Sequence, residues 1–373
     1  MKKLLGFLVV AMLVIIVAVP ACGEMLNIGD YTVVSEIKLQ QLTSSILLND
    51  GTFLLTGMSD NAGVCFLLDQ RGSLIHQYRI DALKSTHSTT VRGAALIGEN
   101  IIATVYDYVS NTSFIAVISL AGNITITEDF GGEIEAVTPL ESCMLVCGSY
   151  YNKQKKQVPW AAKVGKKGEY EWVFEGEANQ VDAPGFLKHF EFCTEYASEY
   201  VLLQHEALGY PDGNVYTMIR LTKDGTPIFR ENINLPKMEF GCNFSNIIVN
   251  KETLILYGGI CTSNYQYVAT AVAINRQAEV LWLKENVESV GIGAAESYNG
   301  CYYFSLTIPE CLGNTIMVVD EIGNMIETFV NPFDLSLADS NIRNIITDED
   351  NSLWIVGTIE NGEHCYIAKF AGQ

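Results

Sequence analysis

The chain has 373 residues, 49% of them hydrophobic and only 18% charged, so it can form one large repeat domain or two ordinary ones with a sizeable core. Its formal net charge of −20 repels phosphate backbones, which excludes nucleic acid as a partner. Eighteen tyrosines and sixteen phenylalanines favour strands over helices.

Residues 1–21 have the pattern of a secretory signal peptide. Lys2 and Lys3 form a short positive region, and residues 4–19 are apolar with one glycine. The segment Val-Pro-Ala-Cys at 19–22 resembles a bacterial lipobox, whose cysteine is lipidated and becomes the new N-terminus. We therefore expect lipid attachment at Cys22.

This interpretation predicts an exported lipoprotein on the outer face of the cytoplasmic membrane or on the cell surface, with residues 22–30 as a short tether. Two alternatives stay open. Ordinary cleavage would release the protein, and an uncleaved segment over residues 4–21 is just long enough to span a bilayer.

A short glycine-marked turn recurs about every 50 residues from the first unit onward, each time after an apolar run. The copies lie at 69–72, 119–122, 165–168, 222–225, 275–278 (with alanine in place of glycine) and 320–323. In the first unit, Asn49-Asp50-Gly51 between two apolar runs is a strong hairpin signal. Each unit therefore contains four short runs separated by turns.

The second run of every unit is strongly apolar and four to eight residues long, which favours strands. These runs lie at 52–57, 100–106, 142–148, 199–205, 252–259, 300–307 and 351–357. Seven four-stranded units predict an all-β fold, a seven-bladed β-propeller over residues 31–373. Six or eight blades are the alternatives.

The two ends of this repeat are incomplete in complementary ways. The last unit lacks its fourth run, and residues 31–39 form an additional alternating strand before the first unit. Pairing of residues 31–39 with residues 364–370 would close the ring and leave no unpaired outer edge.

Two copies of the repeat carry an alanine, a polar turn and then a tryptophan, at 161–172 and 271–282. This pattern resembles the repeats of pyrroloquinoline-quinone-type propellers. The quinone dehydrogenases of that superfamily use an adjacent cysteine pair and a calcium site, and no Cys-Cys dipeptide occurs here. We therefore expect no cofactor. Non-enzymatic lipoprotein scaffolds of envelope assembly are the nearer analogy.

Cysteine and histidine spacing gives no sign of a metal site. Most of the ten cysteines lie in or beside apolar runs, where they are expected to be buried small hydrophobic residues. The sequence contains no Cys-x-x-Cys pair. The repeat pattern assigns the five histidines to different units. We therefore expect no bound metal.

Function is expected on the face that carries the connections between second and third strands and between blades, because these loops are long and aromatic. Tyr108, Tyr150, Tyr210 and Tyr265 represent them. Residues near the start of the first strands should line the channel entrance. The candidates there are Arg92, Glu133, His189, Asn243 and Asn341.

These features predict a monomeric scaffold that binds a protein or glycan partner in the cell envelope without catalysis. The alternative is an exported glycosidase or lyase with carboxylates at the central channel. Facing carboxylates with raised pKa values would favour the enzyme, and an apolar plug would favour the scaffold.

Overall fold

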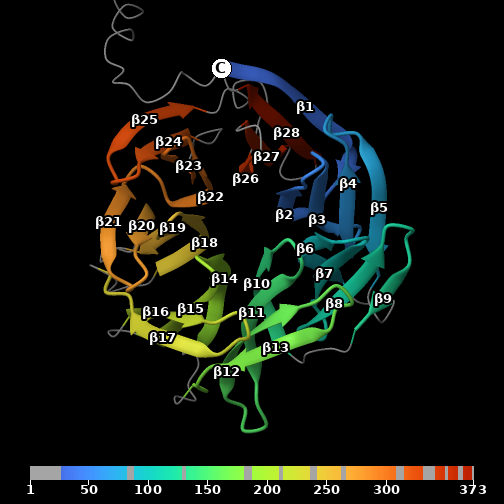
Figure 1. The fold of residues 1–373 in the computed structure, drawn as a ribbon. Helices are drawn as coiled ribbons and strands as arrows, with labels where there is room; N and C mark the ends of the chain where they lie inside the picture. Colours follow the sequence, from blue (N-terminus) through green and yellow to red (C-terminus); the bar gives the residue numbers. More distant parts are fainter. Residues whose placement is uncertain are drawn as a thin grey trace, which may run out of the picture.

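The computed structural model describes residues 27–81, 88–127, 132–179, 187–209, 213–235, 242–261, 266–307, 315–330, 341–348, 352–359 and 364–371. Within these ranges the chain forms seven antiparallel sheets of four strands each. The sheets are arranged as blades around an open centre (Figure 1). The predicted seven-bladed β-propeller is confirmed.

Each blade is a meander whose first strand lies nearest the centre. Blade 1 contains β2 (Gln41–Leu47), β3 (Phe53–Ser59), β4 (Ala62–Leu68) and β5 (Leu74–Ile80). Blade 2 contains β6 (Thr89–Ile97), β7 (Asn100–Asp107), β8 (Thr112–Ser119) and β9 (Ile124–Ile126). Blade 3 contains β10 (Gly132–Pro139), β11 (Met144–Tyr151), β12 (Gln157–Val164) and β13 (Tyr170–Glu175).

The remaining blades repeat this order. Blade 4 contains β14 (Lys188–Tyr196), β15 (Glu199–Gly209), β16 (Gly213–Leu221) and β17 (Pro227–Asn232). Blade 5 contains β18 (Cys242–Asn250), β19 (Thr253–Cys261), β20 (Tyr267–Ile274) and β21 (Val280–Asn286). Blade 6 contains β22 (Gly291–Tyr298), β23 (Cys301–Thr307), β24 (Thr315–Asp320) and β25 (Met325–Val330).

Blade 7 is assembled from both ends of the described chain. β26 (Asn341–Thr347), β27 (Leu353–Ile359) and β28 (His364–Ala371) pair in sequence, and β1 (Asn27–Lys38) adds the outer strand. The register runs from Asn27 opposite Ala371 to Lys38 opposite His364. The predicted closure is confirmed, and β1 begins at Asn27 rather than at residue 31, so residues 27–30 are paired strand.

The predicted signal segment and Cys22 lie outside the described residues. Within the described part of the chain, no helix is long and apolar enough to cross a membrane.

The recurring turns join the third strand to the outer strand of a blade. At the first copy, the Asp69 carboxylate accepts hydrogen bonds from the backbone N–H groups of Arg71 and Ser73, both at 2.8 Å. Gly72 then takes a φ of 77°, a left-handed conformation that glycine adopts at little cost. At the fifth copy Ala278 takes the same conformation, with φ 63°.

Aromatic side chains of the outer strands dock on the turn of the next blade. Trp172 of blade 3 donates its indole N–H to the Lys223 carbonyl at 3.2 Å, and Trp282 of blade 5 donates to the Glu321 carbonyl at 3.1 Å. The Tyr78 hydroxyl of blade 1 reaches the Leu120 carbonyl in the same way, at 3.2 Å. The tryptophans of the repeat therefore fasten one blade to the next.

The two tryptophan docks require glycine beneath the indole. A Cβ on Gly225 would lie 2.8 Å from the Trp172 ring, and one on Gly323 would lie 2.8 Å from the Trp282 ring. Gly122 has a similar backbone, with φ 91°, but nothing lies within 4 Å of its Cβ position.

The cysteines that the structure describes sit in the core, as expected. Cys65, Cys147 and Cys365 are fully buried. Burial raises the pKa of the Cys65 and Cys365 thiols to about 12, which makes them poor nucleophiles. Cys147 and Cys193 come from adjacent blades, and their thiols are hydrogen-bonded to each other.

We expect Gly225→Ala to destabilise the protein more than Gly122→Ala. Both variants incur left-handed strain of about 1 kcal/mol, but only Gly225→Ala also crowds an indole, which adds about 1–3 kcal/mol. Urea unfolding of the two variants measures the difference. In a Trp172→Leu background the two losses should converge; equal losses in the wild-type background would contradict the docking role.

Candidate functional site

Every inner strand slips its register against the second strand once, by one residue. The residue left out of pairing is at the equivalent position in each blade, and we call this set the bulge ring: Thr43, Arg92, Glu135, Glu191, Ser245, Gly293 and Arg343. A β-bulge bends its strand and re-aims a side chain. The residue before each bulge is apolar and no more than 6% exposed: Leu42, Val91, Ile134, Phe190, Phe244, Ile292 and Ile342.

A second set of equivalent residues lies two positions before each bulge. We call it the mouth ring: Gln41, Thr90, Glu133, His189, Asn243, Gly291 and Asn341. Four of the five channel candidates chosen from the sequence belong to it, at Glu133, His189, Asn243 and Asn341. The fifth, Arg92, is in the bulge ring. The candidates therefore occupy two neighbouring levels of the inner strands.

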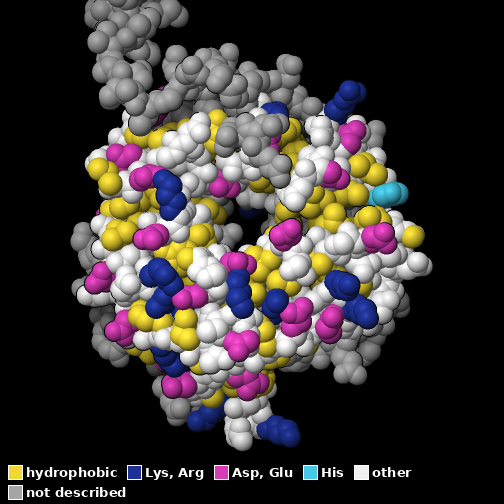
Figure 2. Space-filling view, in the orientation of Figure 1, with side chains coloured by type: hydrophobic (Ala, Val, Ile, Leu, Met, Phe, Trp, Pro, Cys, Tyr) yellow, Lys and Arg dark blue, Asp and Glu magenta, His cyan; other side chains and the backbone are white. Residues whose placement is uncertain are grey.

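The centre of the ring is open, and charged side chains surround the opening (Figure 2). No apolar side chain of the described residues closes this opening in Figure 2. Part of its wall forms a cavity of about 160 Å³ between blades 1, 5, 6 and 7. Polar groups line most of this cavity, including Thr43, Ser44, Ser245, Asn246 and Asn344.

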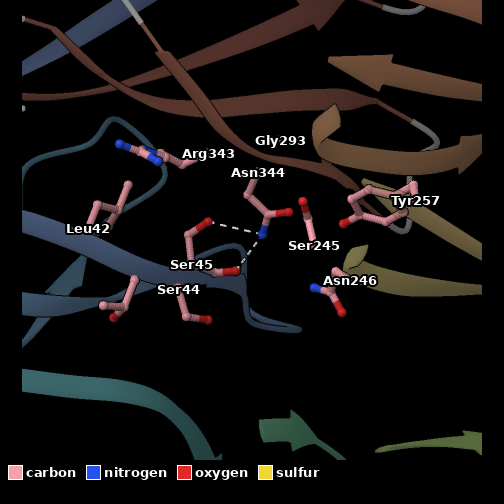
Figure 3. A pocket seen from close by; sticks show the side chains of 10 residues that line it. Leu42, Ser44, Ser45, Ser245, Asn246, Tyr257, Gly293, Arg343 and Asn344 are labelled. Carbon is pink, nitrogen blue, oxygen red and sulfur yellow. Dashed lines mark hydrogen bonds between the residues drawn. The ribbon is translucent and has the colours of Figure 1, made fainter. Parts of the chain in front are cut away.

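Asn344 organises this cavity by joining the last blade to the first. Its amide Nδ2 donates to the Ser45 carbonyl at 2.8 Å and lies 3.1 Å from the Ser45 hydroxyl (Figure 3). Ser245, Asn246 and Tyr257 face them from blade 5 (Figure 3). The arrangement places hydroxyl, amide and phenol groups around one small space.

Blades 2 and 3 carry a cation and two carboxylates. Arg92 forms an ion pair with Glu133 at 2.9 Å, and its guanidinium lies 4.7 Å from the centre of the Tyr106 ring. Burial raises the pKa of Glu133, and the nearby Glu135 carboxylate raises it further. Burial also raises the pKa of Glu135, while Arg92 partly offsets this effect.

Blade 4 brings two histidines and a glutamate together. His189 on β14 pairs directly with His205 on β15, and their ring centroids are 5.2 Å apart. Glu191 lies at the bulge of β14, between Phe190 and Phe192. One ligand atom from each of the three residues falls within 4.8 Å of the other two. The expectation that these histidines lie in different units is wrong, because the antiparallel register joins residues sixteen apart.

Burial sets the protonation states of His189, His205 and Glu191. Burial lowers the pKa of both His189 and His205 to about 4, so both imidazoles are neutral at neutral pH. Burial raises the pKa of Glu191 to about 8, and the Glu135 carboxylate contributes in the same direction. Glu133, Glu135 and Glu191 thus meet the criterion of neighbouring carboxylates with raised pKa values.

The two predicted loop tyrosines that the structure describes, Tyr108 and Tyr150, lie in different environments. Tyr108 is 45% exposed, and its hydroxyl lies 3.4 Å from the Gln41 amide oxygen of the mouth ring. Tyr150 instead donates to Glu175 at 2.7 Å, within its own blade. Tyr210 and Tyr265 lie outside the described residues.

In blades 3 and 4 the segments expected to be long loops instead extend the second and third strands. β11 extends to Tyr151 and β12 starts at Gln157, while β15 and β16 extend to Gly209 and Gly213. Most of the aromatic segments are paired strand, as expected from their β-forming side chains. Glu135, Glu191 and His205 were missed because sequence spacing does not reveal the bulge or the cross-strand partner.

No protein-family model and no curated protein matches this sequence. Among solved structures, an acylaminoacyl peptidase in complex with Z-Gly-Gly-Phe-chloromethyl ketone matches at a TM-score of 0.51 and 11% identity, over 90% of this chain and 51% of the peptidase. This chain thus spans about half of the peptidase. A structure of Drosophila Plexin A in complex with Semaphorin 1b matches at a TM-score of 0.50 and 11% identity, over 92% and 88% of the two chains. These likenesses show the propeller fold alone.

A further carboxylate with a raised pKa lies in blade 6. Burial raises the pKa of Glu296 on β22 to about 7, partly offset by a hydrogen bond from the Ser297 backbone N–H at 2.8 Å. The carboxylate also raises the pKa of the buried Tyr257 hydroxyl. Because the folded state holds the Glu296 proton more tightly than the unfolded chain, folding loses stability as pH rises from about 4.5 to about 7.

We expect Glu296→Gln to stabilise the protein above pH 7 by about 3 kcal/mol and to have little effect below pH 4.5, since the amide cannot ionise. Urea unfolding from pH 4 to pH 8 measures this difference. Glu288→Gln, at an exposed position, is the matched control. A constant difference between Glu296→Gln and wild type across this range would contradict the assignment.

Proposed function

We propose that the protein is an exported, lipid-anchored propeller that binds a glycan in the mouth of its central channel and performs no chemistry on it. The observation that carries this proposal is the open channel lined by polar side chains of the inner strands. Hydroxyl and amide groups of the cavity suit sugar hydroxyls, and tyrosine rings suit sugar faces.

The rim of the channel supports the same proposal. Tyr108 is exposed next to the mouth ring, and Tyr151 and Tyr267 are 66% and 55% exposed at the same ends of their blades. Exposed aromatic side chains add contact area at low cost in conformational entropy. A ligand longer than one sugar can therefore contact the rim as well as the cavity.

A glycosidase or lyase is the second candidate, and the carboxylates favour it. Glu191 is protonated at neutral pH and can donate a proton, and Glu135 interacts with it electrostatically from the next blade. A neighbouring acid and carboxylate are the groups that glycoside hydrolysis needs.

We also infer kinship with the pyrroloquinoline-quinone-like superfamily, on the basis of the Trp172 and Trp282 docks. We expect no quinone site despite this kinship, because the sequence lacks the adjacent cysteine pair of the quinone dehydrogenases. The outer-face location and the anchor remain proposals supported by residues 1–22 alone.

Ligand binding can be tested with a glycan array and two sets of variants. Ser245→Leu combined with Gly293→Leu should abolish binding, because both positions are exposed in the channel wall. Tyr151→Ala combined with Tyr267→Ala should weaken it by about tenfold, through lost stacking. Binding that survives in the channel variant but not in the rim variant would contradict the channel site.

The same array separates the two candidates when its bound glycans are incubated and analysed for cleavage. A binding propeller leaves them intact. Cleavage by the wild type that is lost in Glu135→Gln would instead establish the enzyme.

The anchor has its own test. Cys22→Ala should move the protein from the membrane fraction to the soluble fraction or block its processing, because the substitution removes the thiol that would carry the lipid. Cell fractionation with a blot of the full chain measures this. Unchanged membrane retention would contradict lipidation at Cys22.

A further inference from the structure

We propose that His189, Glu191 and His205 bind one divalent transition-metal ion, with Zn²⁺ as the best fit. The site lies on β14 and β15, the two inner strands of blade 4, and shares no residue with the polar cavity between blades 1, 5, 6 and 7. It goes beyond the proposed glycan binding and does not depend on it.

The geometry of the three residues suits a small ion. Their ligand atoms lie within 4.8 Å of one another, and ligands around a tetrahedral zinc ion lie about 3.4 Å apart. Small side-chain rotations close this difference. The two histidines are fixed opposite each other by strand pairing, while Glu191 lies at the bulge, where the ladder leaves it unpaired.

Two atoms of the cluster lack partners. Glu191 Oε2 and His205 Nε2 are buried without a hydrogen-bond partner among the described residues. Buried polar atoms are nearly always satisfied, and each exception costs about 1–3 kcal/mol. A cation between these atoms would satisfy both at once.

Neighbouring side chains orient the ligands. The Tyr216 ring stacks on His205 with centroids 4.8 Å apart and planes at 7°, and the Tyr216 hydroxyl is hydrogen-bonded to Glu191. The Asn214 side chain forms a hydrogen bond with His205. Such outer contacts fix the rotamer and tautomer of metal-binding histidines.

The chemistry of the donors selects the ion. Two imidazole nitrogens and one carboxylate suit zinc and other first-row divalent metals rather than magnesium or calcium. Binding of the ion requires both imidazole nitrogens unprotonated and the Glu191 carboxylate ionised, so the ion displaces the Glu191 proton. Glu135 adds negative charge nearby, and Lys188, the neighbour of His189 in the sequence, is paired with Glu206 at 3.3 Å.

Three protein ligands leave at least one coordination position for water or for an oxygen of a bound ligand. β14, which carries His189 and Glu191, is the strand of blade 4 nearest the centre of the ring (Figure 1). An ion at this site would let the charged residues of blades 2 to 4 interact, through the metal, with a ligand that enters the channel mouth.

The test is a Zn²⁺ titration of the metal-stripped full chain by calorimetry, with Co²⁺ absorption as a second reading of coordination. We expect one ion per chain, and a loss of affinity of about 100-fold or more in His205→Ala and in Glu191→Gln. His76→Ala, at an exposed position on β5, is the matched control and should bind like wild type.

Thermal unfolding of the same proteins separates lost binding from lost folding. Zinc should raise the melting temperature of wild type and of His76→Ala but not of Glu191→Gln, which keeps the size of the side chain. Equal zinc affinity in wild type, His205→Ala and Glu191→Gln would overturn the proposal, as would the absence of any binding to wild type.

Discussion

The register slip in each inner strand is the constraint on which the rest of this structure depends. Near the axis of a seven-bladed ring, inner strands need apolar contacts between blades and also form the channel wall. The buried residue before each bulge, such as Phe190 or Phe244, makes the apolar contacts between blades. The bulged residue is left out of the ladder, and in four blades it lines the cavity, at Thr43, Ser245, Gly293 and Arg343. Arg92 and Glu191 occupy the same position in two other blades.

This arrangement gives the channel two unlike halves. Blades 2 to 4 contribute an arginine, three half-buried carboxylates and two histidines. Blades 1, 5, 6 and 7 contribute mostly hydroxyls and amides, together with Arg343. Burial raises carboxyl pKa values on both sides, at Glu133 and Glu191 in the first half and at Glu296 in blade 6, but only the first half brings several such groups together. The asymmetry arises from residue choice at equivalent positions, since the backbone bulge is shared by all blades.

The architecture could be derived from the sequence because its signals are local or periodic. The glycine turns, the apolar second runs and the unpaired strand before the first unit identified the blades and their closure. The tryptophans were recognised as part of a repeat, but the carbonyls on which they dock lie in the next blade, 51 and 39 residues away.

The site was predictable only in part. Glu133 and His189 were found because they lie near the start of first strands, but Glu135 and Glu191 follow them by two residues with an apolar residue between. That polar–apolar–polar triplet is the available signal, and it becomes meaningful only when the bulge is known. His205 has no such signal, because its partnership with His189 depends on the pairing of β14 with β15.

The pairing of β1 with β28 also governs when this fold can form. Asn27 lies opposite Ala371, so the outer strand of blade 7 has no partner until nearly the whole chain is made. Contacts of such long sequence separation form slowly, and the chain stays open until they do. For the export that we propose, a ring that closes only when its last strand pairs is compatible with translocation of the extended chain first and folding afterwards.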